Sequence, residues 1–343
     1  MHDDASLFVA LARIDDRRRS WFWYVLDMHD VTNTNRTRRP RFRRASEPPA
    51  FRVTDDDVVI LRLLARHRFL RSTHIAALVD RSLDRTNDRL LRLFHSGHVD
   101  RPRAQLDYYP TSGSGPIVYA LDDLGARLLT ERDGTAFANI EWSRKSREAG
   151  RPFIEHQLEV VDFQVALELV FRPRTDVRLI HSDELIAAFP EQTRIMRNPL
   201  LMRVCVSHNG DGQEIGLIPD LIFGIAFPDG SRRCFMVEID RGTMPISRSD
   251  LRQTSIERKM RAYLAAHANK QHESQFGWKA FRVLTVTTDH QRMHSMIEAL
   301  RQLHIPQSPG ASLFFFAIRA ELRTSNPLAH AWREENGRQV RLV

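Results

Sequence analysis

The chain has 343 residues, enough for two domains of ordinary size, and 42% of them are hydrophobic and 27% charged, as in soluble globular proteins. Its net charge is +8 and only four of its 51 basic residues are lysines, so a polyanionic partner is favoured over a small acidic substrate, although a GC-rich genome produces the same arginine bias. Two cysteines in apolar runs exclude a disulfide framework and a zinc cluster, and the longest early apolar run, Trp21 to Leu26, is too short for a signal sequence or a membrane span, so we expect a cytoplasmic protein.

Residues 1–50 form a basic segment with six arginines between Arg36 and Arg44 and several prolines. This composition predicts a flexible arm that can lie along a nucleic-acid backbone. The same composition is also typical of a solvated tail.

Residues 51–134 carry the pattern of three helices followed by a two-stranded ribbon. Thr54 is a suitable N-cap for the first helix, and the third runs from about Ser82 to His95. Residues 99–103 and 116–121 then predict the two strands of the ribbon. This order is that of a winged helix-turn-helix, in which the third helix lies in the major groove of double-stranded DNA.

Arginines recur on the predicted third helix, on the face opposite its leucines. Guanidinium groups at helical spacing suit both phosphate contact and guanine recognition. The predicted DNA-binding residues are Arg81, Arg85, Thr86, Arg89 and Arg92 on the helix, with Arg101 and Arg103 at the base of the wing. A solvated helix face is one alternative, and a winged helix used for protein–protein contact is another.

Residues 135–152 are polar and predict a linker, residues 153–320 a second domain, and residues 321–343 a C-terminal tail. The expected elements of the second domain are a helix at 153–171, strands at 177–180 and 201–206, a hairpin at 215–241, a helix at 247–268, a strand at 281–287, a helix at 289–304 and a strand at 313–318. This order predicts a mixed sheet flanked by helices, and so an α+β or α/β fold.

The expected hairpin consists of two strands joined by Pro228-Asp229-Gly230, which suits a type I turn closed by a glycine in the left-handed region. If Phe227 pairs with Ser231, Asp220 lies opposite Glu238, and Asp240 shares their side of the sheet. A two-residue loop would turn Asp220 away from Glu238.

Three carboxylates on one face of apolar strands are unfavourable unless their charge is compensated. A hard divalent cation such as Mg²⁺ compensates it through oxygen ligands. The predicted metal ligands are therefore Asp220, Glu238 and Asp240. Acids at a sheet edge that are solvated or paired with arginines are the alternative.

The segments Ile218-Pro219-Asp220 and Glu238-Ile239-Asp240, on successive strands, resemble the PD-(D/E)XK nuclease-like fold over roughly residues 153–318. Together with the winged helix, the stretch GPIVYALDDLGARLL and His156, the chain resembles the replication-relaxation family of bacterial plasmids and mobile elements over residues 55–320. That family is associated with plasmid replication and with relaxation of plasmid DNA.

The resemblance implies Mg²⁺- or Mn²⁺-dependent hydrolysis of DNA, with Asp220 and Glu238 as metal ligands. The position of the nuclease lysine holds Asp240 here, so Lys259 on the following helix is the candidate replacement, unless it is an ordinary surface lysine. If the site is inactive, the chain is a DNA-binding regulator or replication accessory whose nuclease-like domain serves dimerisation or partner docking. The expected partners are double-stranded DNA, a second copy of the chain, and replication or relaxation proteins.

Overall fold

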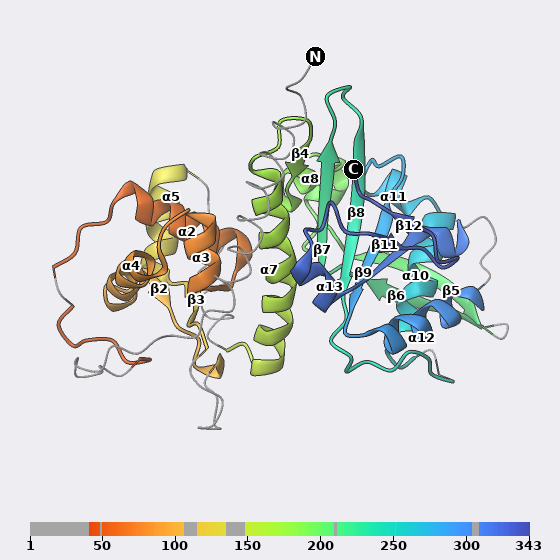
Figure 1. Cartoon of the computed structure of the whole chain (residues 1–343), viewed down its shortest axis with the longest axis horizontal. Coiled ribbons are helices and arrows are strands. Elements are labelled where there is room, and N and C mark those ends of the chain that lie inside the picture. Colours follow the sequence, from red (N-terminus) through yellow and green to blue (C-terminus); the bar gives the residue numbers. More distant parts are fainter. Residues whose placement is uncertain are drawn as a thin grey trace, which may run out of the picture. The chain divides into compact units, whose positions relative to one another are not determined.

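The computed structural model describes residues 41–48, 50–105, 115–134, 148–208, 211–250, 252–303 and 309–343. Contacts divide the chain into two compact units, one ending at Val165 and the other beginning at Ala166. Eleven α-helices, a three-stranded sheet, a two-stranded sheet and a seven-stranded mixed sheet lie within the described ranges, so the fold is mixed α+β (Figure 1). None of the described helices combines the length and the apolar character needed to cross a membrane.

The N-terminal unit contains the helices and the ribbon that the sequence predicts. Its elements are α2 (Asp55–His67), β1 (Leu70–Arg71), α3 (Ser72–Leu78), α4 (Leu83–His95), β2 (Val99–Asp100), β3 (Val118–Leu121) and α5 (Asp123–Asp133). The ribbon strands β2 and β3 are antiparallel, and β1 adds to the other edge of β3, which gives the order β1-β3-β2.

Local sequence sets the bounds of these helices. Thr54 precedes α2 as the predicted N-cap, and the Asp57 carboxylate accepts the Thr54 backbone N–H at 2.8 Å. Ser82 caps α4, and Gly97 follows its end with φ +82°, a value that favours glycine. The start and stop signals read from the sequence are therefore confirmed in this unit.

The long helix α7 (Arg151–Phe171) begins two residues before the predicted start of the second domain. Its first half packs on the N-terminal unit, where Ile154 and Leu158 join Phe69 and Val118 in one apolar cluster. The division into compact units thus falls inside α7, whereas the sequence suggested a division before it. Most of the predicted linker, residues 135–147, lies outside the described residues.

The C-terminal unit follows the predicted order with some additions. After α7 come β4 (Arg178–Ile180), α8 (Ser182–Ala187), α9 (Glu191–Arg194), β5 (Met202–His208), β6 (Asp211–Leu217), β7 (Leu221–Ala226), β8 (Arg232–Ile239), α10 (Ile256–Ala268), α11 (Gln271–Ser274), β9 (Arg282–Thr287), α12 (His290–Arg301), β10 (Phe314–Ile318), α13 (Arg319–Thr324), β11 (Trp332–Arg333) and β12 (Gln339–Val340). The large sheet has the order β12-β11-β10-β9-β8-β7-β4, with β8, β9 and β10 parallel and the other pairs antiparallel.

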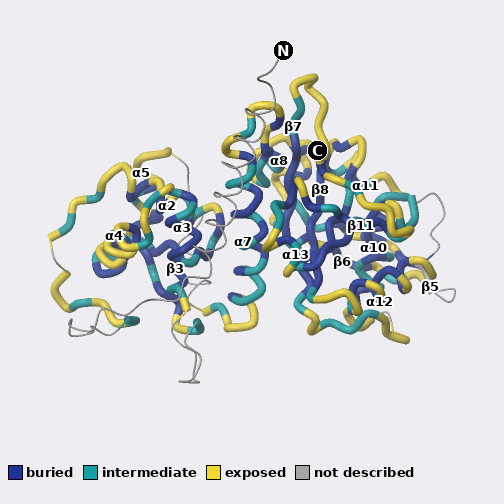
Figure 2. The backbone as a smooth tube through the Cα atoms, viewed as in Figure 1, coloured by how far each residue is buried: buried dark blue, intermediate teal, exposed yellow. Residues whose placement is uncertain are grey.

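One apolar core of this unit lies on the face of the large sheet that carries Cys234 and Met236, and the opposite face, with Phe235 and Val237, is buried as well. Alternate residues of β8, Cys234 and Met236, point into an apolar cluster that also holds Met260 and Tyr263 of α10. Figure 2 shows the central strands β7 and β8 as buried along most of their length. A residue that continues the Cys234 and Met236 face of β8 therefore lies under α10.

Two expected elements are wrong in their extent. The strand expected at 215–227 is broken, because β6 pairs with β5 in a separate sheet and Pro219, which has no N–H to donate, lies between β6 and β7. The helix expected at 247–268 begins only at Ile256, where the Ser255 hydroxyl caps it by accepting the Arg258 N–H at 3.1 Å.

The segment 321–343 is not a tail, as the sequence suggested. It completes α13 and supplies β11 and β12 to the large sheet. Trp332 is fully buried there, and its indole N–H donates to the Pro327 carbonyl at 2.9 Å. Single apolar residues in short strands give no periodic pattern, which explains why the segment was not predicted.

Candidate functional site

The hairpin of β7 and β8 has the predicted turn and register. Gly230 has φ +79°, its N–H donates to the Phe227 carbonyl at 3.0 Å, and the Phe227 N–H donates to the Ser231 carbonyl at 2.9 Å. Leu221 pairs with Val237, so Asp220, one residue before β7, lies in line opposite Glu238. The glycine-closed turn therefore places these two carboxylates next to each other.

Glu238 continues the face of β8 that α10 covers, and two α10 side chains bind it. The Lys259 ammonium donates to Glu238 Oε2 at 2.5 Å, and the Tyr263 hydroxyl donates to Glu238 Oε1 at 2.5 Å. Tyr263 is fully buried, whereas the Lys259 side chain remains 34% exposed. Lys259 therefore reaches from α10 to the Glu238 carboxylate.

Burial and neighbouring charges together set the protonation of Glu238 and Lys259. Burial raises the pKa of Glu238 from 4.5 to about 7; the Lys259 charge opposes this rise, and the Asp220 charge adds to it. Burial lowers the pKa of Lys259, but the charges of Glu238 and Asp220 outweigh it and raise that pKa overall. Near neutral pH the lysine is therefore charged, while the glutamate can take up or release a proton.

Asp220 lies beside the pair formed by Glu238 and Lys259. It is half-buried, and its Oδ2 accepts the backbone N–H of Ile239 at 2.8 Å, which fixes the carboxylate beside β8. Its own N–H donates to the Val237 carbonyl at 3.0 Å. The side chain and the backbone N–H of Asp220 are thus both hydrogen-bonded to β8, the strand that carries Glu238.

Asp240 has a different environment. Its carboxylate accepts Arg292 Nε at 2.5 Å and Arg292 Nη2 at 2.8 Å, and the Thr287 hydroxyl donates to it at 2.7 Å. Within the described part of the chain, no group of three or more His, Cys, Asp or Glu side chains is placed to hold a metal ion. The structure therefore brings Asp220, Glu238 and Lys259 together and ties Asp240 to α12.

Two residues of this region were not recognised from the sequence as site residues. Tyr263 follows Lys259 by four positions, so both lie on one face of α10, and a polar tip on that apolar face was the available signal. Arg292, in the first turn of α12, gives no signal in the sequence, because its partner lies 52 residues away.

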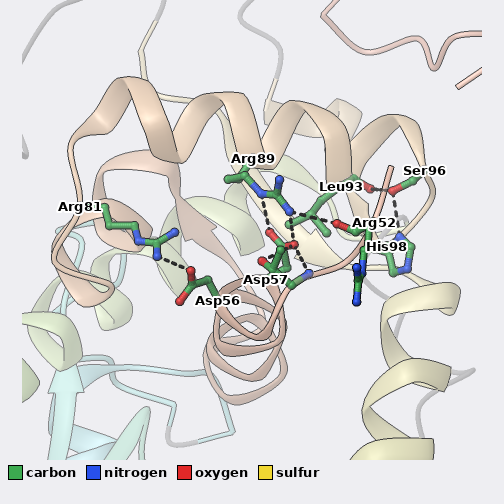
Figure 3. A network of polar contacts seen from close by, with 9 residues as sticks. Arg52, Asp56, Asp57, Arg81, Arg89, Leu93, Ser96 and His98 are labelled. Carbon is green, nitrogen blue, oxygen red and sulfur yellow. Dashed lines mark hydrogen bonds and ion pairs between the residues drawn. The ribbon is translucent and has the colours of Figure 1, made fainter. Parts of the chain in front are cut away.

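The predicted DNA-binding arginines of the N-terminal unit lie in three different environments. Arg85, Arg92 and Arg103 are exposed. Arg81, just before α4, and Arg89, within α4, instead point toward the acidic first turn of α2, where they pair with Asp56 and Asp57 (Figure 3).

The pair of Arg89 with Asp57 is buried on its acidic side. Arg89 Nε donates to Asp57 Oδ1 at 2.8 Å, and the guanidinium also lies over the Phe51 ring with its carbon 4.7 Å from the ring centroid. Burial alone would raise the pKa of Asp57, but the bonds from Arg89 and Thr54 outweigh it and lower that pKa. Arg89 is therefore a structural partner of α2.

Thr86 and Arg101 do not face outward, so this part of the prediction is wrong. Thr86 is buried, with its hydroxyl donating to the Ser82 carbonyl at 3.0 Å, because α4 turns Leu93 inward and leaves Leu91 exposed. Arg101 is buried between Phe94 and Tyr119, and it donates to the Tyr119 hydroxyl at 3.0 Å.

The end of the predicted arm is attached to the same unit. Arg44 donates to the Phe94 carbonyl at 2.9 Å and forms an ion pair with Asp122, and the Ala45 N–H donates to His95 at 3.0 Å. The predicted flexible arm therefore does not include these residues. Residues 1–40 lie outside the described ranges.

Comparison with known proteins gives one match. Residues 61–278 match the protein family described as Replication-relaxation, which is more than half of the chain and includes Asp220, Glu238 and Lys259. Searches of curated proteins and of solved structures each found no match.

Proposed function

Because the chain belongs to the Replication-relaxation family, we propose that it binds double-stranded DNA and cleaves it in a metal-dependent reaction. In this proposal the N-terminal unit is a winged helix-turn-helix that holds the duplex, and the C-terminal unit is a PD-(D/E)XK-like nuclease. Three helices followed by a β-ribbon support the first assignment, and two facing acids on a hairpin within a mixed sheet support the second.

The observation that carries the nuclease proposal is the contact of Lys259 with Glu238. A nuclease site of this type needs two acids and a cation beside them, and the cation is missing from the end of β8, where Asp240 stands. The Lys259 ammonium, 2.5 Å from Glu238 Oε2, supplies that charge from α10. An ordinary surface lysine would have its ammonium in solvent. About two-thirds of the Lys259 side chain is buried instead.

The donor set of Asp220 and Glu238 fits a magnesium ion. Mg²⁺ typically takes one or two carboxylates together with waters and substrate phosphate, and two facing acids meet that requirement without Asp240. Bound there, Mg²⁺ would supply Lewis acidity toward a phosphoryl oxygen and activation of water.

The remaining groups act on the substrate and on the acids. The Lys259 ammonium offsets negative charge that develops on the phosphate during cleavage. The Tyr263 hydroxyl holds Glu238 Oε1 and so fixes the plane of the carboxylate. The bond from Ile239 N–H does the same for Asp220.

A second function is favoured by the same contacts. Both oxygens of Glu238 are already hydrogen-bonded, one to Lys259 and one to Tyr263, so the acid is satisfied within the protein. In that case the C-terminal unit is a catalytically silent nuclease fold, and the chain is a DNA-binding regulator or replication accessory.

Incubation of the protein with supercoiled plasmid separates the two functions. We expect conversion to nicked or linear plasmid in Mg²⁺ or Mn²⁺ and none in EDTA, because cleavage depends on an ion held by Asp220 and Glu238. Gel electrophoresis over time measures the rate. Intact plasmid in every divalent metal, with DNA binding retained, would remove the nuclease and leave the regulator.

The double variant Arg85→Ala, Arg92→Ala tests DNA binding by α4. Both side chains are exposed, so each can contact a phosphate, and we expect weaker binding and a salt dependence shallower by about one counterion per arginine. Fluorescence anisotropy with a labelled duplex at several salt concentrations measures both effects.

A matched control for this test is the double variant Arg62→Ala, Arg132→Ala, which removes two arginines that are paired with Asp133 and Asp55 in the same unit. It changes the net charge by the same amount and should have less effect. Equal losses from both double variants would indicate a general charge effect and would contradict contact through α4.

A further inference from the structure

The carboxylate at the end of β8 is the centre of a cluster that joins four elements. Asp240 accepts two bonds from Arg292 of α12 and one from Thr287 at the end of β9, and its backbone carbonyl accepts Arg319 of α13 at 2.9 Å. Asp240 is nearly fully buried, with 4% of its side chain exposed. A bidentate, buried arginine–carboxylate pair fixes geometry more strictly than a surface pair does.

Arg292 also holds the chain that leaves β8. Its Nη2 donates to the Met244 carbonyl as well as to Asp240. Between these two points Gly242 has φ +78°, and its N–H donates to Asp240 Oδ1 at 3.2 Å. One guanidinium therefore closes the turn of residues 240–244.

The next two residues of this turn bind the beginning of α10. The Pro245 carbonyl accepts the Ile256 N–H at 3.1 Å, and the Ile246 carbonyl accepts the Glu257 N–H at 2.8 Å. The first N–H groups of a helix have no partner inside the helix, so these two bonds set where α10 starts. Lys259 is in this same first turn.

We propose that Arg292 is a positioning residue, which sets the Lys259 ammonium against Glu238 by clamping residues 240–246 between the end of β8 and the first turn of α10. Asp240 is then an anchor for Arg292, which gives a role to the acid that stands in the lysine position. The catalytic part of this inference rests on the proposed nuclease function.

Hydrogen exchange tests the clamp without reference to cleavage. In Arg292→Gln, the amides of Ile256 and Glu257 should exchange at least about tenfold faster than in the wild type, while amides of the central strands β8 and β9 keep their rates. The control is Arg301→Gln, nine positions further along α12, whose side chain pairs with Glu298 on the surface. It should leave both sets of amides unchanged.

Cleavage kinetics test the consequence for Lys259. Arg292→Gln should lower kcat about 10- to 100-fold with little change in KM, because misplacement of a charged group affects the transition state more than DNA binding. Arg292→Lys keeps a positive charge near Asp240. Its ammonium lacks the planar set of N–H donors with which the guanidinium bonds both Asp240 and Met244, so this variant should recover only part of kcat.

The outcomes are distinct. Unchanged exchange at Ile256 and Glu257 would overturn the clamp, and so would faster exchange spread evenly over the whole C-terminal unit, which would mean a general loss of stability. If the wild-type protein does not cleave DNA, the proposed function fails, and the exchange experiment still decides whether Arg292 positions α10. If Arg292→Gln does not fold, the same exchange pattern is sought in Arg292→Lys.

Discussion

Glu238→Gln should reduce metal-dependent cleavage of plasmid DNA by about 100-fold or more, because a bound metal ion contributes several kcal/mol to such a reaction. The amide has nearly the shape of the carboxyl group but no charge with which to hold a cation. Asp220→Asn should have the same effect. The rate of nicking, measured at saturating Mg²⁺ in the wild type, provides the comparison.

The wild-type rate should also depend on pH. Burial raises the pKa of Glu238 to about 7 in the metal-free protein, and Mg²⁺ must displace this proton to bind, so at subsaturating Mg²⁺ the rate should fall about tenfold per pH unit below that value and level off above it. Glu335→Gln, a change at a partly exposed residue between β11 and β12, is the control and should keep the wild-type rate and profile. A Glu238→Gln enzyme with the wild-type rate would contradict the assignment of this acid.

Stability measurements distinguish loss of the site from loss of the fold. The folded protein keeps the Glu238 proton up to a pH near 7, whereas the unfolded chain releases it near 4.5, so the ionised carboxyl destabilises the fold increasingly as pH rises between these values. The total is about 3 kcal/mol. Relative to Glu238→Gln, the wild type should lose about this free energy of unfolding across that interval, as measured by urea denaturation.

Trp332→Ala should lower the free energy of unfolding of the C-terminal unit by about 3 to 5 kcal/mol, the cost of removing a large side chain from a core. Trp332 is fully buried, packs edge-on against His330, and donates to the Pro327 carbonyl, which would lose its partner. Trp332→Phe keeps an aromatic ring without the N–H and should lose less.

Urea denaturation followed by the fluorescence of Trp278 measures the transition of this unit, because Trp278 is also buried there. Arg341→Ala, a change at an exposed residue just after β12, is the control and should change stability by no more than about 0.5 kcal/mol. A loss below about 1 kcal/mol in Trp332→Ala would mean that the last two strands contribute little to the sheet.

The sequence predicted the turn, the strand register and the facing pair Asp220 and Glu238, because these features depend on residues within one hairpin. Pro228-Asp229-Gly230 determined the turn, the turn determined the register, and the register placed Asp220 opposite Glu238. Helical spacing also placed Lys259 near the buried face of α10, although only the packing of α10 over β8 decided that its ammonium reaches Glu238. Each of these steps involves residues close in sequence or joined by one hairpin.

The sequence did not predict the environments of side chains whose partners lie far away along the chain. The spacing of Asp240 suggested a third metal ligand, but Arg292 and Thr287, from elements much later in the chain, bind its carboxylate. Arg101 was assigned to the surface by its charge, yet Phe94 and Tyr119 enclose it. A charged side chain is buried when tertiary structure supplies partners, and a single sequence does not list them.

The buried partnership of Arg89 with Asp57 also limits how the surface of α4 can respond to a ligand. If Arg89 swung out to meet an anion, Asp57 would be stranded without a counter-charge in a dry interior, a loss of several kcal/mol. The Arg89–Asp57 pair thus fixes the orientation of α4 relative to α2 before a ligand binds. A ligand that binds this surface must therefore fit the backbone of α2 and α4 as it stands, and only the exposed side chains can change conformation on binding.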